Sequence, residues 1–160
     1  DKIVNAFFQS ITTRTAGFTT IDQSALNPVS HILSCFLMFV GGSPASIAGG
    51  IKTTTLFILL LMLFRNTDKD GNIIYKNKKI KNSLLSKAVR ITLIAFMLVI
   101  ISSISIYLIE GGAHSFGAVV YDTISAVCTV GLSFGITPVL SIPSKLIVLF
   151  FGRLTPLTPL

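Results

Sequence analysis

The chain has 160 residues with a net charge of +7, and 51% of its residues are hydrophobic against 12% charged. Its mean hydropathy of +0.81 is too high for an ordinary soluble domain and indicates a membrane protein. His31 and His114 have no Cys, His or carboxylate neighbours at the spacing of metal ligands. The sequence also shows no pairing of a nucleophilic residue with a general base that would indicate nucleophilic catalysis. We therefore expect neither an enzyme nor a covalently bound cofactor.

The first expected element is a pore loop over residues 3–21, a short helical segment followed by the sequence TAGF. An interrupted helix over residues 28–65 comes next. Its apolar stretches, 29–40 and 56–64, are each too short to cross a bilayer.

The sequence GGSPASIAGG separates these two stretches. Each glycine costs a helix about 1 kcal/mol and proline about 3 kcal/mol, so an unwound loop lining a water-filled path is predicted. Close packing of small residues is the alternative. A phosphate-binding loop is excluded, because Ile51 separates Gly50 from Lys52.

Residues 66–87 form a basic loop in which NIIYKNKKI is expected to be a short strand or hairpin. Positive charge between apolar segments marks the cytoplasmic side of a membrane protein. This reading is favoured over a binding site for lipid or an acidic partner, and nucleic acid is not expected as a partner.

A full span is predicted over residues 88–109, with Arg90 at its end. A second pore loop is expected over 118–137, where VVYDTISAVCTVGLSFGIT is too polar for a span. The final helix, 144–160, contains Arg153 and ends in proline-rich sequence. Cys35 and Cys128 lie in apolar surroundings and are interpreted as small hydrophobic residues, not as a disulfide.

The chain contains an internal repeat. Placing Gly17 on Gly131 aligns AFFQSITTRTAGFTT with VYDTISAVCTVGLSF, and LNPVSHIL then corresponds to LSIPSKLI. The predicted fold is an all-α membrane protein of repeated units, each a span, a re-entrant pore loop and a span. The first unit lacks its first span, so we expect the chain to belong to a longer polypeptide.

The repeated loops suggest a filter of backbone carbonyls that replace the hydration shell of a monovalent cation. Glycine can adopt positive φ and keep successive carbonyls on one side, and the C-terminal end of the preceding half-helix favours a cation. Taken singly, TAG and TVG are common packing tripeptides, but their duplication favours a filter. Arg14 is interpreted as a clamp or outer electrostatic barrier, and Asp122 as a partner of the pore-helix backbone or a neighbouring loop. The predicted filter residues are Thr15, Ala16, Gly17, Phe18, Thr129, Val130, Gly131 and Leu132.

The motifs TTRTAGFTTID, GGSPASIAGGIKTTT, SAVCTVGLSFGIT and FFGRLTPLT resemble the third and fourth pore units of the Trk/Ktr/HKT superfamily of potassium transporters. The TVGL filter and the basic loop look most like the Ktr branch. The resemblance implies potassium uptake across the plasma membrane by a multi-pass protein, with sodium coupling as a family expectation. The ending GRLTPLTP departs from the family's usual GRLGPLTL.

The resemblance also implies a gate below the filter, with Arg153 as its partner and Lys52 near the cytoplasmic end of the cavity. An arginine snorkelling to the interface is the alternative for Arg153. The implied gate residues are Gly41, Gly42, Ser43, Pro44, Ala45, Ser46, Ile47, Ala48, Gly49 and Gly50.

The implied partners are the remaining pore units of the same polypeptide, a second copy in a homodimer, membrane lipid and a cytosolic nucleotide-binding regulatory subunit. Two other functions stay open: a secondary transporter of a small solute that uses broken helices, and a membrane assembly protein without a pore.

Overall fold

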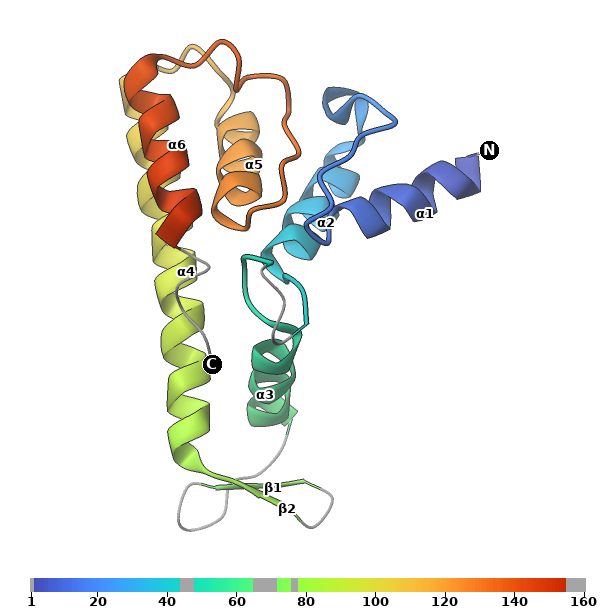
Figure 1. Cartoon of the computed structure of the whole chain (residues 1–160), viewed down its shortest axis with the longest axis vertical. Helices are drawn as coiled ribbons and strands as arrows, with labels where there is room; N and C mark the ends of the chain where they lie inside the picture. The colour runs from blue at the N-terminus through green and yellow to red at the C-terminus, as the bar shows by residue number, and fades with distance from the viewer. Residues whose placement is uncertain (1, 44–47, 65–71, 76–77, 155–160) are drawn as a thin grey trace.

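The computed structural model describes residues 2–43, 48–64, 72–75 and 78–154. The described part is mostly helical, as the sequence predicts, with one small hairpin (Figure 1). Its elements in chain order are α1 (Lys2–Thr12), a 3-10 turn (Gln23–Ala25), α2 (Pro28–Phe39), α3 (Thr53–Phe64), β1 (Ile73–Tyr75), β2 (Lys78–Ile80), α4 (Asn82–Ile109), α5 (Phe116–Val127) and α6 (Ile142–Leu154).

Helix α4 runs along the long axis of the molecule and packs against α3, α5 and α6 (Figure 1). Within the described residues it alone is long and apolar enough to cross a membrane. Thr92 and Ser105 donate to the carbonyls of Ala88 and Ile101, one turn earlier in the helix, whereas the buried Ser103 hydroxyl has no hydrogen-bond partner among the described residues. The helix begins at Asn82, earlier than the predicted start at residue 88.

The short helices α1 and α5 are each followed by an irregular segment and then by another helix, α2 and α6 respectively (Figure 1). From α5 the chain returns to the end of the molecule where α5 began, and α6 then runs antiparallel to α4. The segment after α1 leads in the same way into α2, and α3 continues toward the hairpin. Local capping fixes two of these starts, because the side chains of Asn27 and Ser115 accept bonds from Val29 N and Ala118 N.

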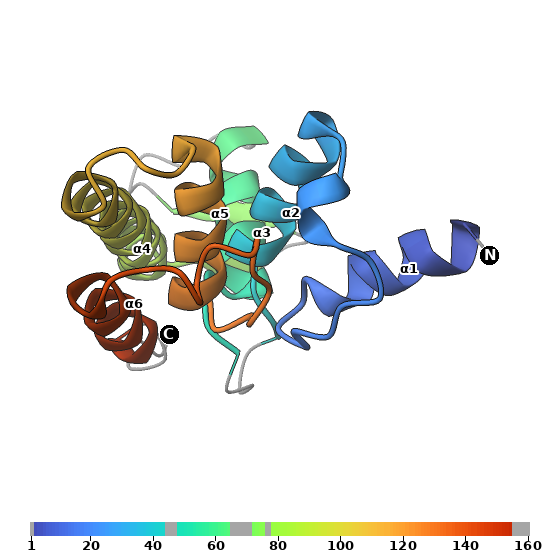
Figure 2. The ribbon, with the colours of Figure 1, turned by 90° about the horizontal axis from the view of Figure 1, so that it is seen from above.

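Helix α5 lies in the interior, between α2 on one side and α4 and α6 on the other (Figure 2). The main cluster of buried side chains surrounds it and consists of Met38, Val99, Tyr121, Ile124, Val127, Cys128, Val130 and Leu132. Helix α1, by contrast, points away from the other helices and exposes Ile3, Val4, Phe7 and Ile11. The described part of the chain therefore leaves the apolar surface of α1 exposed.

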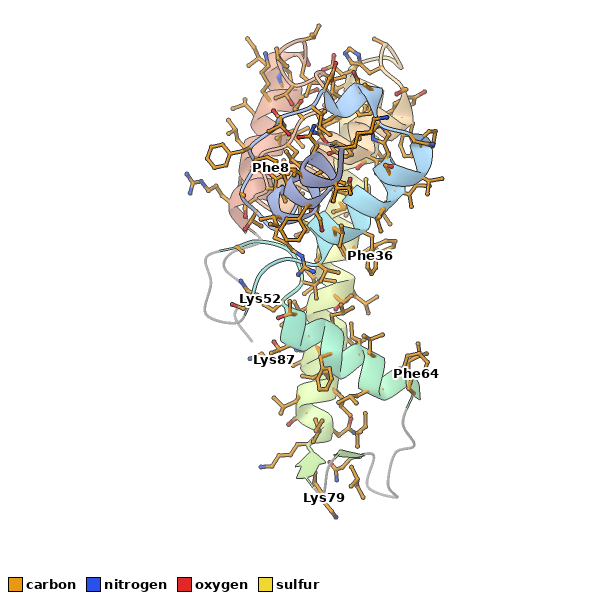
Figure 3. The ribbon with its side chains drawn as sticks, turned by 90° about the vertical axis from the view of Figure 1, so that its right-hand side faces the viewer. Phe8, Phe36, Lys52, Phe64, Lys79 and Lys87 are labelled. Carbon is orange, nitrogen blue, oxygen red and sulfur yellow. The ribbon has the colours of Figure 1, made fainter. Side chains whose placement is uncertain are left out.

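The basic segment forms the expected hairpin, in which β1 and β2 are antiparallel. Ile73 is fully buried and packs with Leu61 of α3 and Leu85 of α4. The Asn72 side chain accepts a hydrogen bond from Asn82 N at the start of α4. The hairpin therefore fastens the ends of α3 and α4 together, and Lys79 lies at this end of the molecule (Figure 3).

Candidate functional site

The irregular segments after α1 and α5 share an unusual backbone geometry. We call residues 13–20 the first glycine loop and residues 128–137 the second glycine loop. In the first, Thr15 and Gly17 have φ of 68° and 74°, and in the second, Thr129 and Gly131 have φ of 56° and 93°. Each loop therefore has the same succession of backbone conformations at the positions that the sequence repeat aligns. The predicted filter residues 15–18 and 129–132 all lie in these two loops.

The two glycine loops approach each other at their glycines (Figure 2). A Cβ atom on Gly17 would lie 3.4 Å from Gly131 Cα and would collide with the carbonyl oxygen of Val130. A Cβ atom on Gly131 would lie 3.7 Å from Gly17 Cα. This approach brings together residues from the two halves of the sequence repeat.

Side chains of the short helices hold each glycine loop in place. The Thr12 hydroxyl at the end of α1 donates to the carbonyl of Phe18 at 2.5 Å. In the second loop, the Asp122 carboxylate accepts bonds from the hydroxyls of Ser133 and Thr137 and from Phe134 N. Asp122 thus supports the neighbouring loop, which was one of its two interpretations from sequence.

A buried polar network joins the two halves. Gln9 in α1 donates to Gln23 Oε1 at 2.6 Å, and the Tyr121 hydroxyl of α5 donates to the same oxygen at 2.9 Å. Gln23 also donates to the carbonyl of Ile21. Because these groups are buried, their mutual bonding fixes α1 relative to α5. Sequence analysis missed this network, since the separate residues have no local signal.

The described residues between α2 and α3 are not helical, and they lie in the range 28–65 for which the sequence predicts an interrupted helix. We call residues 41–50 the interrupting loop, of which 44–47, including Pro44, Ala45, Ser46 and Ile47, lie outside the described residues. Val40 and Ile51 form a single parallel β-bridge that closes the loop. Gly41 N donates to the carbonyl of Ile51, and Ile51 N donates to that of Phe39, both at 2.9 Å.

Near its C-terminal end, at Gly49, the interrupting loop contacts the second glycine loop. Gly49 N donates to the Thr129 hydroxyl oxygen at 2.8 Å. The Lys52 ammonium donates to the carbonyl of Ala48 at 2.6 Å, which places Lys52 beside the interrupting loop (Figure 3). Gly42 accepts a bond from Thr53 N at the start of α3.

Arg153 lies near the end of α6 and is exposed. It borders a cavity of about 440 Å³ together with Thr129, Gly131 and Gly152. Within the described part of the chain, no hydrogen bond joins Arg153 to residues 41–43 or 48–50. Its predicted role as partner of the interrupting loop therefore stays a prediction. Helix α6 continues through Gly152 and Arg153 to Leu154, whereas α2 ends at Phe39.

Arg14, within the first glycine loop, has an exposed side chain. The positive φ of Thr15 and Thr129 was missed from the sequence, because only the glycines were expected to adopt it. The duplication of the threonine together with the glycine was the one available signal.

The structure defines a class of membrane protein in which non-helical backbone lies between short and interrupted helices, as in proteins that move ions or small solutes. The family model described as TrkH, cation transport protein, matches residues 1–158. The chain therefore belongs to the TrkH family of cation transport proteins, which confirms the resemblance found from its motifs.

Three relatives cover nearly all of the chain. It is 36% identical to Ktr system potassium uptake protein D of Bacillus subtilis over 99% of the chain and 35% of that protein. It is 31% identical to protein B of the same system, over 99% of the chain and 36% of the relative. The potassium/sodium uptake protein NtpJ of Enterococcus hirae is also 31% identical, with the same coverage. The chain thus spans about a third of the length of these relatives.

Proposed function

We propose that the chain supplies two of the pore loops of a membrane protein that takes up potassium. Ions would shed water beside the paired glycine loops, on the axis that further pore units would surround, and bind the backbone carbonyls of residues 15–18 and 129–132. The observation that supports this most is the matched sequence of φ signs in two loops whose glycines face each other. Alternating φ signs let successive carbonyls point to one side, which a carbonyl filter requires.

The electrostatics of the short helices favour a cation at this place. Helices α1 and α5 end at Thr12 and Val127, immediately before the two glycine loops. The C-terminal end of a helix has a partial charge of roughly −0.5, so both ends attract a positive ion. The relatives named potassium uptake proteins agree with this choice of ion.

The interrupting loop is proposed as the gate. It lies on the side of the second glycine loop that faces α3 and contacts it through Gly49 and Thr129 (Figure 1). Arg153 borders the cavity next to Thr129 and is proposed as the partner of the gate. Lys52, held to Ala48, lies where the cavity would open toward the cytoplasm.

The remaining proposals concern the whole protein. Helices α2 with α3, α4 and α6 would cross the plasma membrane, with the basic hairpin in the cytoplasm. Further pore units of one polypeptide would complete the filter, and two copies would form a dimer. A cytosolic nucleotide-binding subunit would regulate it, in agreement with relatives that are named as parts of a Ktr system. We also propose that uptake is coupled to sodium. The relative NtpJ, which is named a potassium/sodium uptake protein, supports this proposal.

Growth of a strain that lacks potassium uptake tests the proposal. The full-length protein should restore growth at low potassium, and Gly131→Ser should reduce the discrimination between potassium and sodium. Gly135→Ser is the matched control, because Gly135 has φ of 95° but open space around a Cβ atom. Unchanged discrimination in Gly131→Ser would argue for a small-solute transporter or for a protein without a filter.

A further inference from the structure

The contact between Gly49 and Thr129 joins the interrupting loop to the second glycine loop across 80 residues of sequence. It is steric as well as polar. A Cβ atom on Gly49 would lie 2.7 Å from the carbonyl carbon and oxygen of Cys128 and 2.8 Å from Thr129 Oγ1. Only glycine can therefore bring its N–H group this close to the threonine hydroxyl.

The corresponding threonine of the first glycine loop makes no such bond. Thr15 has the same left-handed backbone as Thr129, but its hydroxyl has no hydrogen-bond partner among the residues that the structure describes. A threonine at positive φ is unfavourable by about 1–3 kcal/mol wherever it occurs. The two threonines therefore share the strain of the loop and differ in the bond to Gly49.

Two further bonds of the described part of the interrupting loop lie within its own segment. The Val40–Ile51 bridge closes its base, and Lys52 donates to the carbonyl of Ala48. These bonds can move together with the loop. The bond from Gly49 to Thr129 cannot, because its acceptor belongs to the second glycine loop after α5.

We propose that the Thr129 hydroxyl docks the interrupting loop against the second glycine loop, so that this bond must break before the loop can leave. Thr129 is then a positioning residue for the gate as well as a source of a filter carbonyl. The inference rests on the proposed role of the interrupting loop as the gate. Its direct test, however, measures docking and requires no transport.

Hydrogen exchange at the Gly49 amide in the full-length protein is that test. Losing one neutral hydrogen bond should speed exchange about five- to tenfold in Thr129→Val, which keeps the β-branched shape. Thr129→Ser keeps the hydroxyl and should remain close to the unaltered protein. Thr15→Val is the matched control and should leave Gly49 protected. The amides of Gly41 and Ile51 report whether the base of the loop stays closed.

A second readout is the rate of potassium uptake. Thr129→Val should change the rate at which the gate opens more than Thr15→Val does, with Thr129→Ser restoring it. Equal protection of Gly49 in Thr129→Val and the unaltered protein would overturn the inference, as would equal loss of protection in Thr15→Val. Either result would leave the proposed filter intact, because the filter is tested separately by the selectivity of Gly131→Ser.

Discussion

Gly17 and Gly131 face each other where the two glycine loops meet, with so little space that a Cβ atom on Gly17 would collide with the carbonyl oxygen of Val130. The contact is asymmetric. A Cβ atom on Gly131 would lie 3.7 Å from Gly17 Cα, which is an ordinary van der Waals separation.

This asymmetry predicts different outcomes for the same substitution. Gly131→Ala should be destabilising by about 1–2 kcal/mol through its positive φ alone. Gly17→Ala adds a backbone clash and should lower thermal stability and potassium selectivity further. Thermal unfolding and uptake of the purified, reconstituted full-length protein measure both effects. Equal losses in the two variants would show that the loops do not approach each other as described.

Asp122 should be needed for the geometry of the second glycine loop. In Asp122→Ala, Phe134 N loses its acceptor, at a cost of about 1 kcal/mol for the loss of a half-buried hydrogen bond. Exchange of the Phe134 amide should rise, and the discrimination between potassium and sodium should fall. Ser133→Ala removes only one of the three donors to Asp122 and should have a smaller effect. A normal Phe134 amide in Asp122→Ala would contradict the supporting role.

The hydrogen bonds of Glu110 connect the end of α4 to the start of α6, and we expect this connection to weaken in acid. Bonds from the hydroxyl of Ser144 and from the hydroxyl and N–H of Ser141 lower its pKa from 4.5 to about 2. Because the folded pKa is depressed, this stabilisation is complete above pH 4.5 and is lost as the pH falls toward 2.

Thermal unfolding of the full-length protein across this pH range measures the contribution. The unaltered protein should lose more stability than Glu110→Gln on acidification, since the variant has no carboxylate to protonate. Parallel curves for the two proteins would show that Glu110 does not contribute to the pH dependence.

Substitution of Arg153 should change the flux of potassium. Its positive charge borders the same cavity as Thr129 and Gly131, so it opposes the entry of a cation. Arg153→Ala should therefore raise potassium uptake, whereas Arg153→Lys should remain near the unaltered rate. Lys145→Ala is a control at the other end of α6, where the ammonium donates to the carbonyl of Pro138. Unchanged flux and gating in Arg153→Ala would remove this residue from the gate.

Local chemistry made several elements predictable. Glycines and a proline predicted the interruption after α2, and the apolar run predicted α4. The start of α4 was missed because the span predicted from hydropathy alone begins at residue 88. Leu85, one turn earlier, is buried against Ile73 of the hairpin, so tertiary packing extends the helix.

The candidate site was predictable only where both copies of the repeat show the same signal. Alignment of Gly17 with Gly131 located both glycine loops. The left-handed backbone of Thr15 and Thr129 could not be predicted, since β-branched residues disfavour it locally. The bond from Gly49 to Thr129 has no signature in the sequence, because neither residue is unusual among its neighbours.

The most direct measurement for the proposed filter is the position of a bound ion. Crystals of the full-length protein in thallium, a heavy substitute for potassium, would reveal bound ions by anomalous scattering. The proposal predicts density on the pore side of the two glycine loops, beside the carbonyl oxygens of residues 15–18 and 129–132. Density at other places in the protein, with none beside these carbonyl oxygens, would contradict it.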